Sequence, residues 1–107
     1  MPNNYKNAKL DLTTTDITTL YTCPAATISI IKSIIVSEDS NASSTITLTL
    51  TNASSAVFSL FKDKSISAKE TKELLTAPLI LEASEILKVT AGNANRLHVV
   101  ASLLEVS

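Results

Sequence analysis

The residues able to perform acid–base or nucleophilic chemistry are few in this chain. It has one histidine, His98, and one cysteine, Cys23, among 107 residues. A catalytic histidine needs a nucleophile or a carboxylate held beside it, and no motif in the sequence supplies one. Cys23 precedes Pro24 in an apolar segment without a basic neighbour. This context is typical of a buried free thiol and not of an activated thiolate. We therefore expect a protein that is not an enzyme.

Two pairs of carboxylates have the residue types of a general acid and a general base: Asp11 with Asp16, and Glu82 with Glu85. These residues lie at the ends of predicted strands and in predicted turns, where solvated side chains are the favoured interpretation. The sequence contains no glycine-rich phosphate loop, no zinc-ligand spacing and no nucleophile elbow. We expect neither a metal ion nor an organic cofactor.

Charge and hydropathy exclude several classes of partner. The formal net charge is −1, and the lysines are interspersed with acidic residues, so neither a nucleic acid nor an anionic membrane is expected to bind. No window approaches the roughly 20 consecutive apolar residues of a membrane span. The segment Met1–Asn4 lacks the pattern of a secretory signal. Together with the single cysteine, this indicates synthesis in a reducing cytoplasm.

The composition predicts an all-β domain. Hydrophobic residues make up 45% of the chain and charged residues 18%, which is too apolar for a disordered segment. Threonine and serine together supply about a quarter of the residues, and β-branched residues favour strands. The chain has one glycine, so its turns must use Asn, Asp, Ser and Ala. Residues 1–107 are expected to form one domain, with residues 1–9 either part of it or an extended N-terminal arm.

The clearest strand is Ser44–Asn52. It alternates three apolar residues with four threonines: Ile46, Leu48 and Leu50 with Thr45, Thr47, Thr49 and Thr51. The preceding run, Ile28–Glu38, is joined to it by a predicted turn at 39–43, and we expect the two to form an antiparallel hairpin. Ile31 and Ile35 break the alternation of that run, which indicates burial on both faces or a β-bulge.

The remaining strand candidates bring the total to eight or nine, at the spacing of a β-sandwich. They are Tyr5–Leu12, Thr18–Cys23, Ala56–Lys62, Leu79–Leu81, Glu85–Ala91 and Arg96–Val106. The segment Ser67–Leu75 has two interpretations. Its Ser67–Glu70 capping box favours a short helix ended by Pro78, whereas the alternative is a strand over Thr71–Leu75.

Candidate interaction residues are uncharged. The threonine face (Thr45, Thr47, Thr49 and Thr51) and Tyr5 are the predicted interface, because flat, uncharged strand faces favour association. The competing interpretation is an ordinary solvated face. A glycan-binding module is a further alternative, which predicts a concave site with exposed Tyr5 or Tyr21. Phe58 and Phe61 are assigned to the core.

Several segments carry a resemblance to a known group of proteins. They are Leu20–Ala25 leading into Ile28–Ile34, then Pro78–Ala91, and finally Leu97–Glu105. In this order the chain resembles small virion structural proteins of tailed bacteriophages. The resemblance implies a single antiparallel β-sandwich of jelly-roll type with about eight strands. The family pattern often has glycine after Pro-Ala and after Leu-Glu-Ala, where this chain has Ala26 and Ser84.

The resemblance also implies a role on the virion, with no catalytic residues. The favoured role is a capsid decoration, or cement, subunit that stabilises the shell through contacts with the major capsid protein or other virion proteins. A neck or tail accessory protein of the same fold is the near alternative. The protein is expected to be made in the host cytoplasm, to reside in the virion and to form a homo-oligomer, with a trimer favoured.

Overall fold

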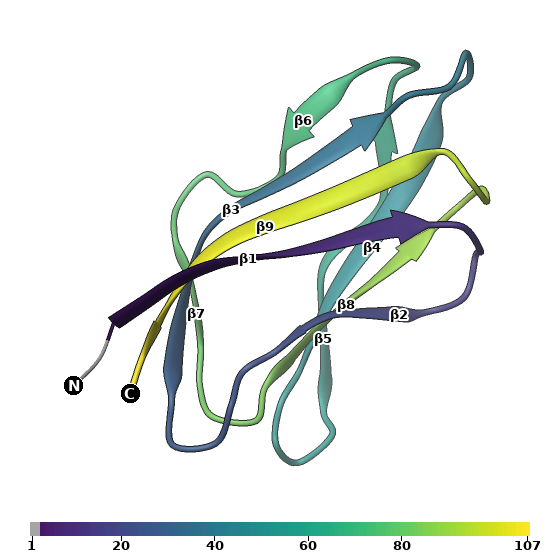
Figure 1. The fold of residues 1–107 in the computed structure, drawn as a ribbon. Helices are drawn as coiled ribbons and strands as arrows, with labels where there is room; N and C mark the ends of the chain where they lie inside the picture. Colours follow the sequence, from purple (N-terminus) through teal and green to yellow (C-terminus); the bar gives the residue numbers. More distant parts are fainter. Residues whose placement is uncertain (1–2) are drawn as a thin grey trace.

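A computed structural model describes residues 3–107 and contains nine β-strands and no helix in that range (Figure 1). The strands match the predicted ones closely, although β5 continues to Ile66, beyond its expected end at Lys62. In chain order they are β1 (Asn3–Leu12), β2 (Thr18–Thr22), β3 (Ile28–Glu38), β4 (Ser44–Thr51), β5 (Val57–Ile66), β6 (Thr71–Glu73), β7 (Leu79–Leu81), β8 (Ile86–Ala91) and β9 (Leu97–Val106).

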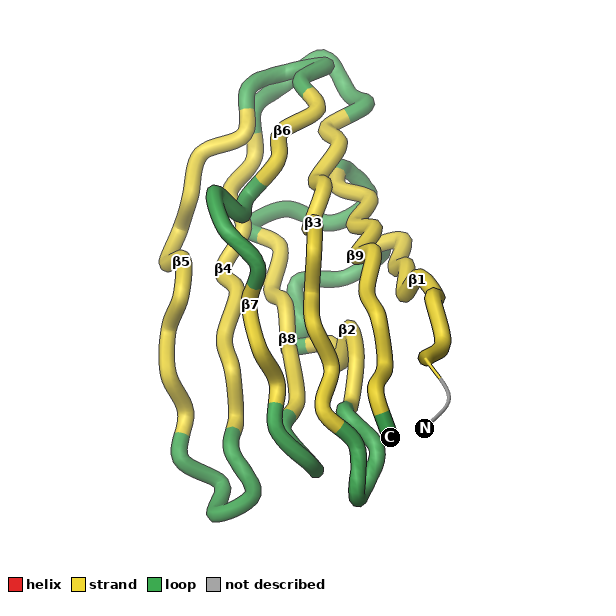
Figure 2. Tube along the Cα trace, turned by 90° about the vertical axis from the view of Figure 1, so that its left-hand side faces the viewer, coloured by secondary structure: helices red, strands yellow, loops and turns green. Residues whose placement is uncertain are grey.

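The strands form two antiparallel sheets that pack face to face (Figure 2). Sheet A has the order β1-β9-β3, and β6 and β7 both pair with the far edge of β3; sheet B has the order β2-β8-β4-β5. Because β6 and β7 pair with different parts of β3, together they take the place of one strand. The arrangement is then an eight-position jelly roll, which confirms the predicted fold class.

The expected hairpin between β3 and β4 is wrong. β3 lies in sheet A, whereas β4 lies in sheet B between β8 and β5. Residues 39–43 therefore cross from one sheet to the other instead of reversing the chain within a sheet. Alternation along a strand specifies which of its faces is buried, but it carries no information about which strand lies alongside.

The core lies between the sheets and is supplied by the inward stripe of each strand. In sheet B, Ile46, Leu48, Leu87 and Val89 are fully buried, as predicted. Phe61 packs at the margin of this core. The assignment of Phe58 to the core is wrong, since 52% of its surface is exposed. β5 is the outer strand of sheet B, where the facing sheet ends in the three-residue strands β6 and β7. Sheet A contributes Leu12, Ile31, Ile34, Val36, Leu81, Leu97, Val99, Ala101 and Leu103.

A β-bulge interrupts β3, which confirms one of the two predicted explanations for its broken pattern. The register of β3 against β9 shifts between Ile31 and Ser33. Ile31 before the bulge and Ile34 after it are both fully buried, because the extra residue exchanges the two faces of the strand. Consequently Ile28 and Ile30, expected to share a face with Ile34, lie on the opposite face.

Glu73 of β6 stabilises this bulge. Its carboxylate accepts hydrogen bonds from the Ser33 hydroxyl and from the backbone nitrogens of Ile34 (2.8 Å) and Leu75 (3.1 Å). Burial raises the pKa of Glu73, but the hydrogen bonds from Ser33 and the backbone outweigh it, and the pKa lies below the usual value. The side chain thus completes the pairing of β3 where neither β6 nor β7 reaches it.

We expect Glu73→Gln to lower the free energy of unfolding by about 1–2 kcal/mol at neutral pH, because a neutral amide accepts these bonds more weakly. The folded-state pKa is depressed, so the carboxylate's contribution is present above the unfolded-state pKa and is lost as the pH falls through the folded-state value. Urea unfolding of the wild type and the variant should converge as the pH falls from the unfolded-state pKa of about 4.3 through the lower folded-state pKa. Glu82→Gln, in an exposed turn, is the control, and a difference that stays constant with pH would contradict the account.

Several turns use left-handed residues that are not glycine. In residues 3–107, positive φ occurs at Ala26 (59°), Ser55 (67°), Asp63 (50°), Lys69 (60°), Ser84 (68°) and Asn95 (62°). Ala26 and Ser84 are the two positions at which the resembled family has glycine. Side chains adopt this conformation at a cost of about 1–2 kcal/mol each. Gly92 is needed for space and not for a left-handed backbone, because a Cβ at this position would lie 2.1 Å from Thr45 Oγ1.

Ala26→Gly and Ser84→Gly should each raise the free energy of unfolding by about 0.5–1 kcal/mol, because the relief of strain exceeds the added entropy of the unfolded chain. Equilibrium denaturation with urea measures the change. Ala25→Gly and Ala83→Gly are matched controls in the same two turns, without positive φ, and they should lower stability. Loss of stability at position 26 or 84 would show that the left-handed geometry costs nothing there.

The segment Ser67–Leu75 forms a turn followed by strand β6, not a helix. The Glu70 carboxylate accepts a hydrogen bond from Ser67 N (2.9 Å), and Glu70 N donates to Ser67 O (3.1 Å). The first is one of the two contacts of a capping box, whereas the second is the backbone hydrogen bond of a β-turn, and together they close a turn whose third residue, Lys69, is left-handed. The local signal was therefore real, and its helical interpretation was wrong.

The beginning of the described chain is part of the sheet. Residues 3–9 belong to β1 and pair continuously with β9, so they do not form a free arm. Residues 1–2 of the expected arm lie outside the described residues. Within residues 3–107, no helix has the length and apolar character needed to cross a membrane.

Candidate interaction surfaces

An apolar row crosses the outer face of sheet A. The register places Tyr5 of β1 opposite Leu104 of β9, Leu104 opposite Ile30 of β3, and Ile30 opposite Ile80 of β7. Directly opposed residues of antiparallel strands share a face. Tyr5 is 73% exposed and Ile80 is 50% exposed, so the shared face is the one toward solvent. These four residues are called the apolar row below.

The neighbouring residues enlarge this surface. Ile28, which is 51% exposed, and its cross-strand partner Val106 form the next pair toward the chain ends. Lys32, at the β3 bulge, places its Nζ 6.0 Å from the ring centroid of Tyr5. At that distance the cation can interact with the face of the ring. Contiguous exposed apolar surface with a polar margin is typical of a protein-docking site.

The threonine face lies on the other side of the sandwich, so the predicted interface residues are not brought together. Thr45, Thr47 and Thr49 are half-buried because β4 is flanked on both sides. The Thr47 hydroxyl accepts a hydrogen bond from Asp63 N (3.0 Å). Thr51 is buried, and its hydroxyl has no partner within residues 3–107. A role of these threonines in an interface stays a prediction.

A polar cluster lies beneath the apolar row and ties the two sheets together. The hydroxyl of Tyr21, on β2 of sheet B, hydrogen-bonds to the Ser29 hydroxyl (2.6 Å) and donates to the Glu105 carboxylate, both in sheet A. Lys6 Nζ lies 3.5 Å from the same carboxylate. Burial, and then the hydrogen bond to Glu105, raise the pKa of Tyr21 well above its usual range. Because Glu105 adjoins Leu104 in β9, this tie supports the strand that carries the apolar row.

Two sequence-based expectations meet this cluster. Cys23 is a buried free thiol, as predicted, with Sγ 3.2 Å from the Ser29 hydroxyl. Tyr21 is only 8% exposed and its hydroxyl is engaged, so the expectation that it could form a sugar-stacking platform is wrong. Tyr5 is exposed, but it lies on a strand face within the apolar row.

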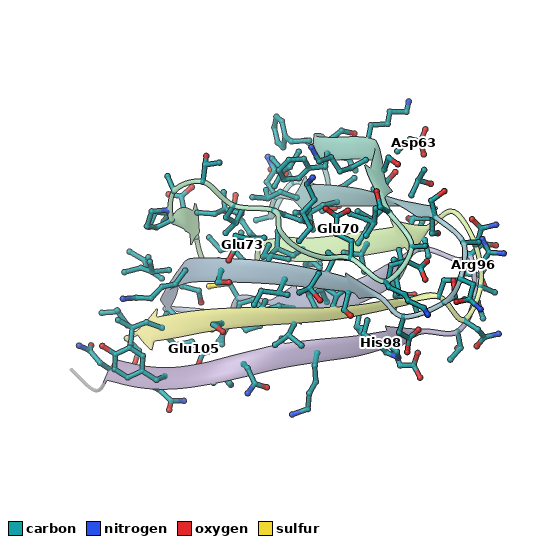
Figure 3. All side chains as sticks on the ribbon, turned by 90° about the horizontal axis from the view of Figure 1, so that it is seen from above. Asp63, Glu70, Glu73, Arg96, His98 and Glu105 are labelled. Atoms are coloured by element: carbon teal, nitrogen blue, oxygen red, sulfur yellow. The ribbon has the colours of Figure 1, made fainter. Side chains whose placement is uncertain are left out.

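His98 lies near the beginning of strand β9, where its side chain is partly exposed (Figure 3). Its Nε2 is 3.2 Å from Asp11 Oδ1 and its Nδ1 is 3.5 Å from Asp39 Oδ2. The side chain is 44% exposed, and its cross-strand partner in β3 is Ser37. Within residues 3–107, no group of three or more His, Cys, Asp or Glu could hold a metal ion. The arrangement holds a partly exposed histidine between two carboxylates.

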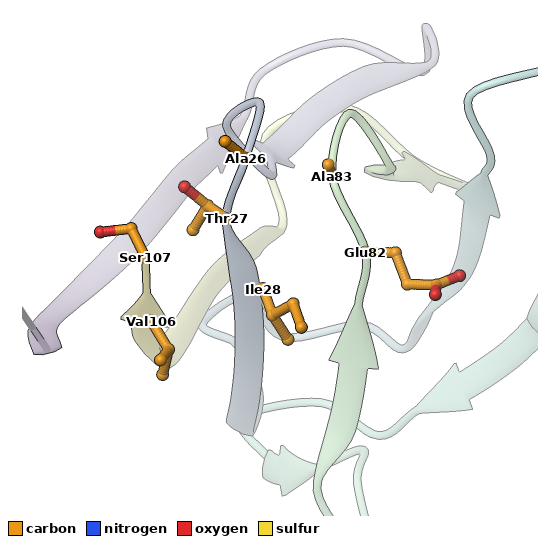
Figure 4. A pocket seen from close by; sticks show the side chains of 7 residues that line it. All are labelled: Ala26, Thr27, Ile28, Glu82, Ala83, Val106 and Ser107. Atoms are coloured by element: carbon orange, nitrogen blue, oxygen red, sulfur yellow. The ribbon is translucent and has the colours of Figure 1, made fainter. Parts of the chain in front are cut away.

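The surface of residues 3–107 has several hollows. One of about 580 Å³ lies between the start of β3, the β7–β8 turn and the end of β9 (Figure 4). Glu82, the sole acidic side chain that lines it, points away from Ile28 and Val106 (Figure 4). The backbone nitrogen of Glu82 donates a hydrogen bond to the Glu85 carboxylate (2.8 Å). The Glu82–Glu85 pair named in the sequence analysis therefore closes a turn.

A second exposed apolar region follows strand β5 at the edge of sheet B. Val57, Phe58 and Leu60 are 62%, 52% and 37% exposed. The register with β4 shifts twice along this strand, which marks bulges at Leu60 and at Lys62–Asp63. Bulges and edge lysines oppose the addition of a further strand. Beside β5, a hollow of about 240 Å³ is lined by Leu60, Phe61 and residues 74–79.

Comparison with known proteins places the fold. No family model matches the sequence, and the curated proteins yield no match. Among solved structures, the viral particle of infectious bursal disease virus is similar with a TM-score of 0.57 and 8% identity, over 96% of this chain and 30% of that chain. A structure of the Gx strain of the same virus has a TM-score of 0.55 and 12% identity, over 98% of this chain and 33% of that chain. A mutant VP2 protein from derived T=1 particles of that virus has a TM-score of 0.52 and 9% identity, over 96% of this chain and 31% of that chain.

These likenesses define a class of fold. The chain is a jelly-roll β-sandwich of the kind that forms one part of these viral proteins. It spans about a third of the length of each of them.

The sequence analysis missed most of the apolar row. It identified Tyr5, but it assigned no surface role to Ile30, Ile80 or Leu104. The available signal was the break in alternation around Lys32 and Ser33. A bulge there exchanges the faces of β3 and turns Ile30 outward, whereas the cross-strand register that aligns the row depends on the fold as a whole.

Proposed function

We propose that this protein is a virion structural subunit, and more specifically a capsid decoration subunit of a tailed bacteriophage that adds contacts between shell proteins. The observation that carries the proposal is the likeness of nearly the whole chain to part of virus-particle proteins. The order of sequence segments that resembles small phage virion proteins supports the finer assignment.

Docking through the outer face of sheet A fits this role. Tyr5, Ile80 and Ile28 offer exposed side chains that gain free energy when a partner removes them from water, and the buried Leu104 lies beside them in the same row. The Tyr21–Glu105 contact fixes β9 against sheet B, and Glu73 stabilises the bulge of β3. A pre-organised, rigid face loses little conformational entropy on binding. The partner is the major capsid protein or another virion protein that presents a complementary apolar surface.

Self-association is part of the proposal, since most repeated subunits assemble around a symmetry axis. The resemblance favours a trimer, which needs a contact between two different surface patches. A neck or tail accessory position remains the alternative for the same fold and differs in the number of copies on the particle.

The test is the protein content of particles purified by density gradient from the lysate in which this chain is made. Quantitative peptide mass spectrometry should find the chain at a fixed ratio to the major shell subunit. A ratio that corresponds to a single ring per particle would move the protein to the neck or tail. Absence from washed particles would overturn the proposal.

A further inference from the structure

The four sheet edges of this sandwich are protected to different degrees. β2 has five residues and a register shift between Thr19 and Tyr21. β6 and β7 have three residues each. β5 carries two bulges and the lysines Lys62 and Lys64. Short strands, bulges and lysines are the devices by which proteins prevent edge-to-edge pairing.

β1 lacks most of these devices. It pairs with β9 from Asn3–Val106 to Leu12–Leu97 without a register shift, and it contains no proline. Within residues 3–107 no strand pairs with its other edge. Along that edge, alternate residues present unpaired backbone N–H and C=O groups. The edge is therefore long, straight and open to another strand.

We propose that β1 pairs antiparallel with β1 of a second copy about a two-fold axis at Asn7, which joins the two A sheets into one continuous sheet. Residues 3–11 of each copy are then paired. Tyr5 lies opposite the partner's Lys9, and Lys6 lies opposite the partner's Ala8. The two apolar rows come to lie on the same face of the joined sheet, since a two-fold axis normal to the sheet keeps its outer sides together.

The charges of β1 select this register. An axis at Lys6 or at Lys9 would place two lysines directly opposite each other, which is destabilising. An axis at Ala8 pairs as many residues but makes the two Lys9 side chains diagonal neighbours. The axis at Asn7 places Lys9 beside a tyrosine ring instead. Its one diagonal lysine pair involves Lys6, whose Nζ is held 3.5 Å from Glu105 of its own copy.

The proposal is tested by the mass of the purified full chain, measured by light scattering after size exclusion. We expect twice the chain mass of 11.4 kDa, that is, a dimer in place of the trimer that the resemblance favours. Asn7→Lys places two lysines on the axis and should raise the dimer dissociation constant by about tenfold or more. Asn7→Ser is the control and should stay dimeric. Because residue 7 is exposed, both variants should keep the wild-type unfolding midpoint once dissociation is allowed for.

Cross-linking tests the register itself. Opposed residues on the axis lie within disulfide distance, so oxidised Asn7→Cys should form a covalent dimer. Cys23 is buried and does not compete. Ser59→Cys, exposed on β5, is the matched control and should cross-link slowly. A monomer or a trimer in solution, a dimer unaffected by Asn7→Lys, or equal cross-linking at positions 7 and 59 would each overturn the proposal. A monomer that is still found on particles would leave the proposed virion role intact and overturn only the proposed self-association.

Discussion

Replacing Tyr21 by phenylalanine is expected to lower the free energy of unfolding by about 1.5–3 kcal/mol, the usual worth of a hydrogen bond to a charged group. The substitution removes the contact between sheet B and the Glu105 carboxylate. It leaves that carboxylate, 12% exposed, with Lys6 as its charged partner. The loss should be measured by urea denaturation at neutral pH. Tyr5→Phe, at the exposed tyrosine, is the matched control and should change stability little.

Tyr21→Phe and Tyr5→Phe also test how the free energy of unfolding depends on pH. The pKa of Tyr21 is raised in the folded state, first by burial and then by the hydrogen bond to Glu105. Its contribution to stability is therefore present below the unfolded-state pKa of about 10 and is lost as the pH rises above it, by up to about 1.4 kcal/mol per pH unit. Tyr21→Phe should remove this slope, whereas Tyr5→Phe should keep it. Equal slopes in both variants would show that Tyr21 does not carry the alkaline sensitivity.

A charge in the apolar row should abolish docking. Ile80→Glu places a carboxylate in the row at a residue that is already 50% exposed, so the fold should lose little stability. A central interface residue is worth about 2 kcal/mol or more, and we therefore expect binding to particles to weaken by about 30-fold or more. The measurement is co-sedimentation of purified protein with particles prepared without it.

Phe58→Ser is the matched control for this variant. It removes an apolar side chain of similar exposure, 52%, from the β5 edge of sheet B. Binding should be preserved in this variant. The reverse outcome, with binding lost at position 58 and kept at position 80, would place the docking surface at β5 and contradict the role of sheet A.

The strands of this fold could be read from the sequence because their signals are local. The alternation in Ser44–Asn52 corresponds to β4, and the predicted strand Glu85–Ala91 corresponds to β8. Pairing was harder to predict. β3 and β4 are adjacent in the chain but lie in different sheets, and the turn between them has the composition of a hairpin turn. Strand partners are determined by the packing of both sheets, which no short segment encodes.

The candidate surface was only partly predictable for the same reason. Tyr5 was identified as an exposed aromatic residue, but its partners Leu104, Ile30 and Ile80 come from three other strands. Aligning them requires the bulge in β3, which exchanges the faces of that strand. The threonine alternation gave a stronger sequence signal, yet it marks a half-buried face that includes the buried Thr51.

The most direct test of the central claim is electron cryo-microscopy of the purified particles. We expect density for this nine-stranded sandwich at regular positions on the particle, with Tyr5, Ile28 and Ile80 of sheet A covered by a neighbouring virion protein. Particles without such density, or subunits whose outer face of sheet A is exposed to solvent, would contradict the account.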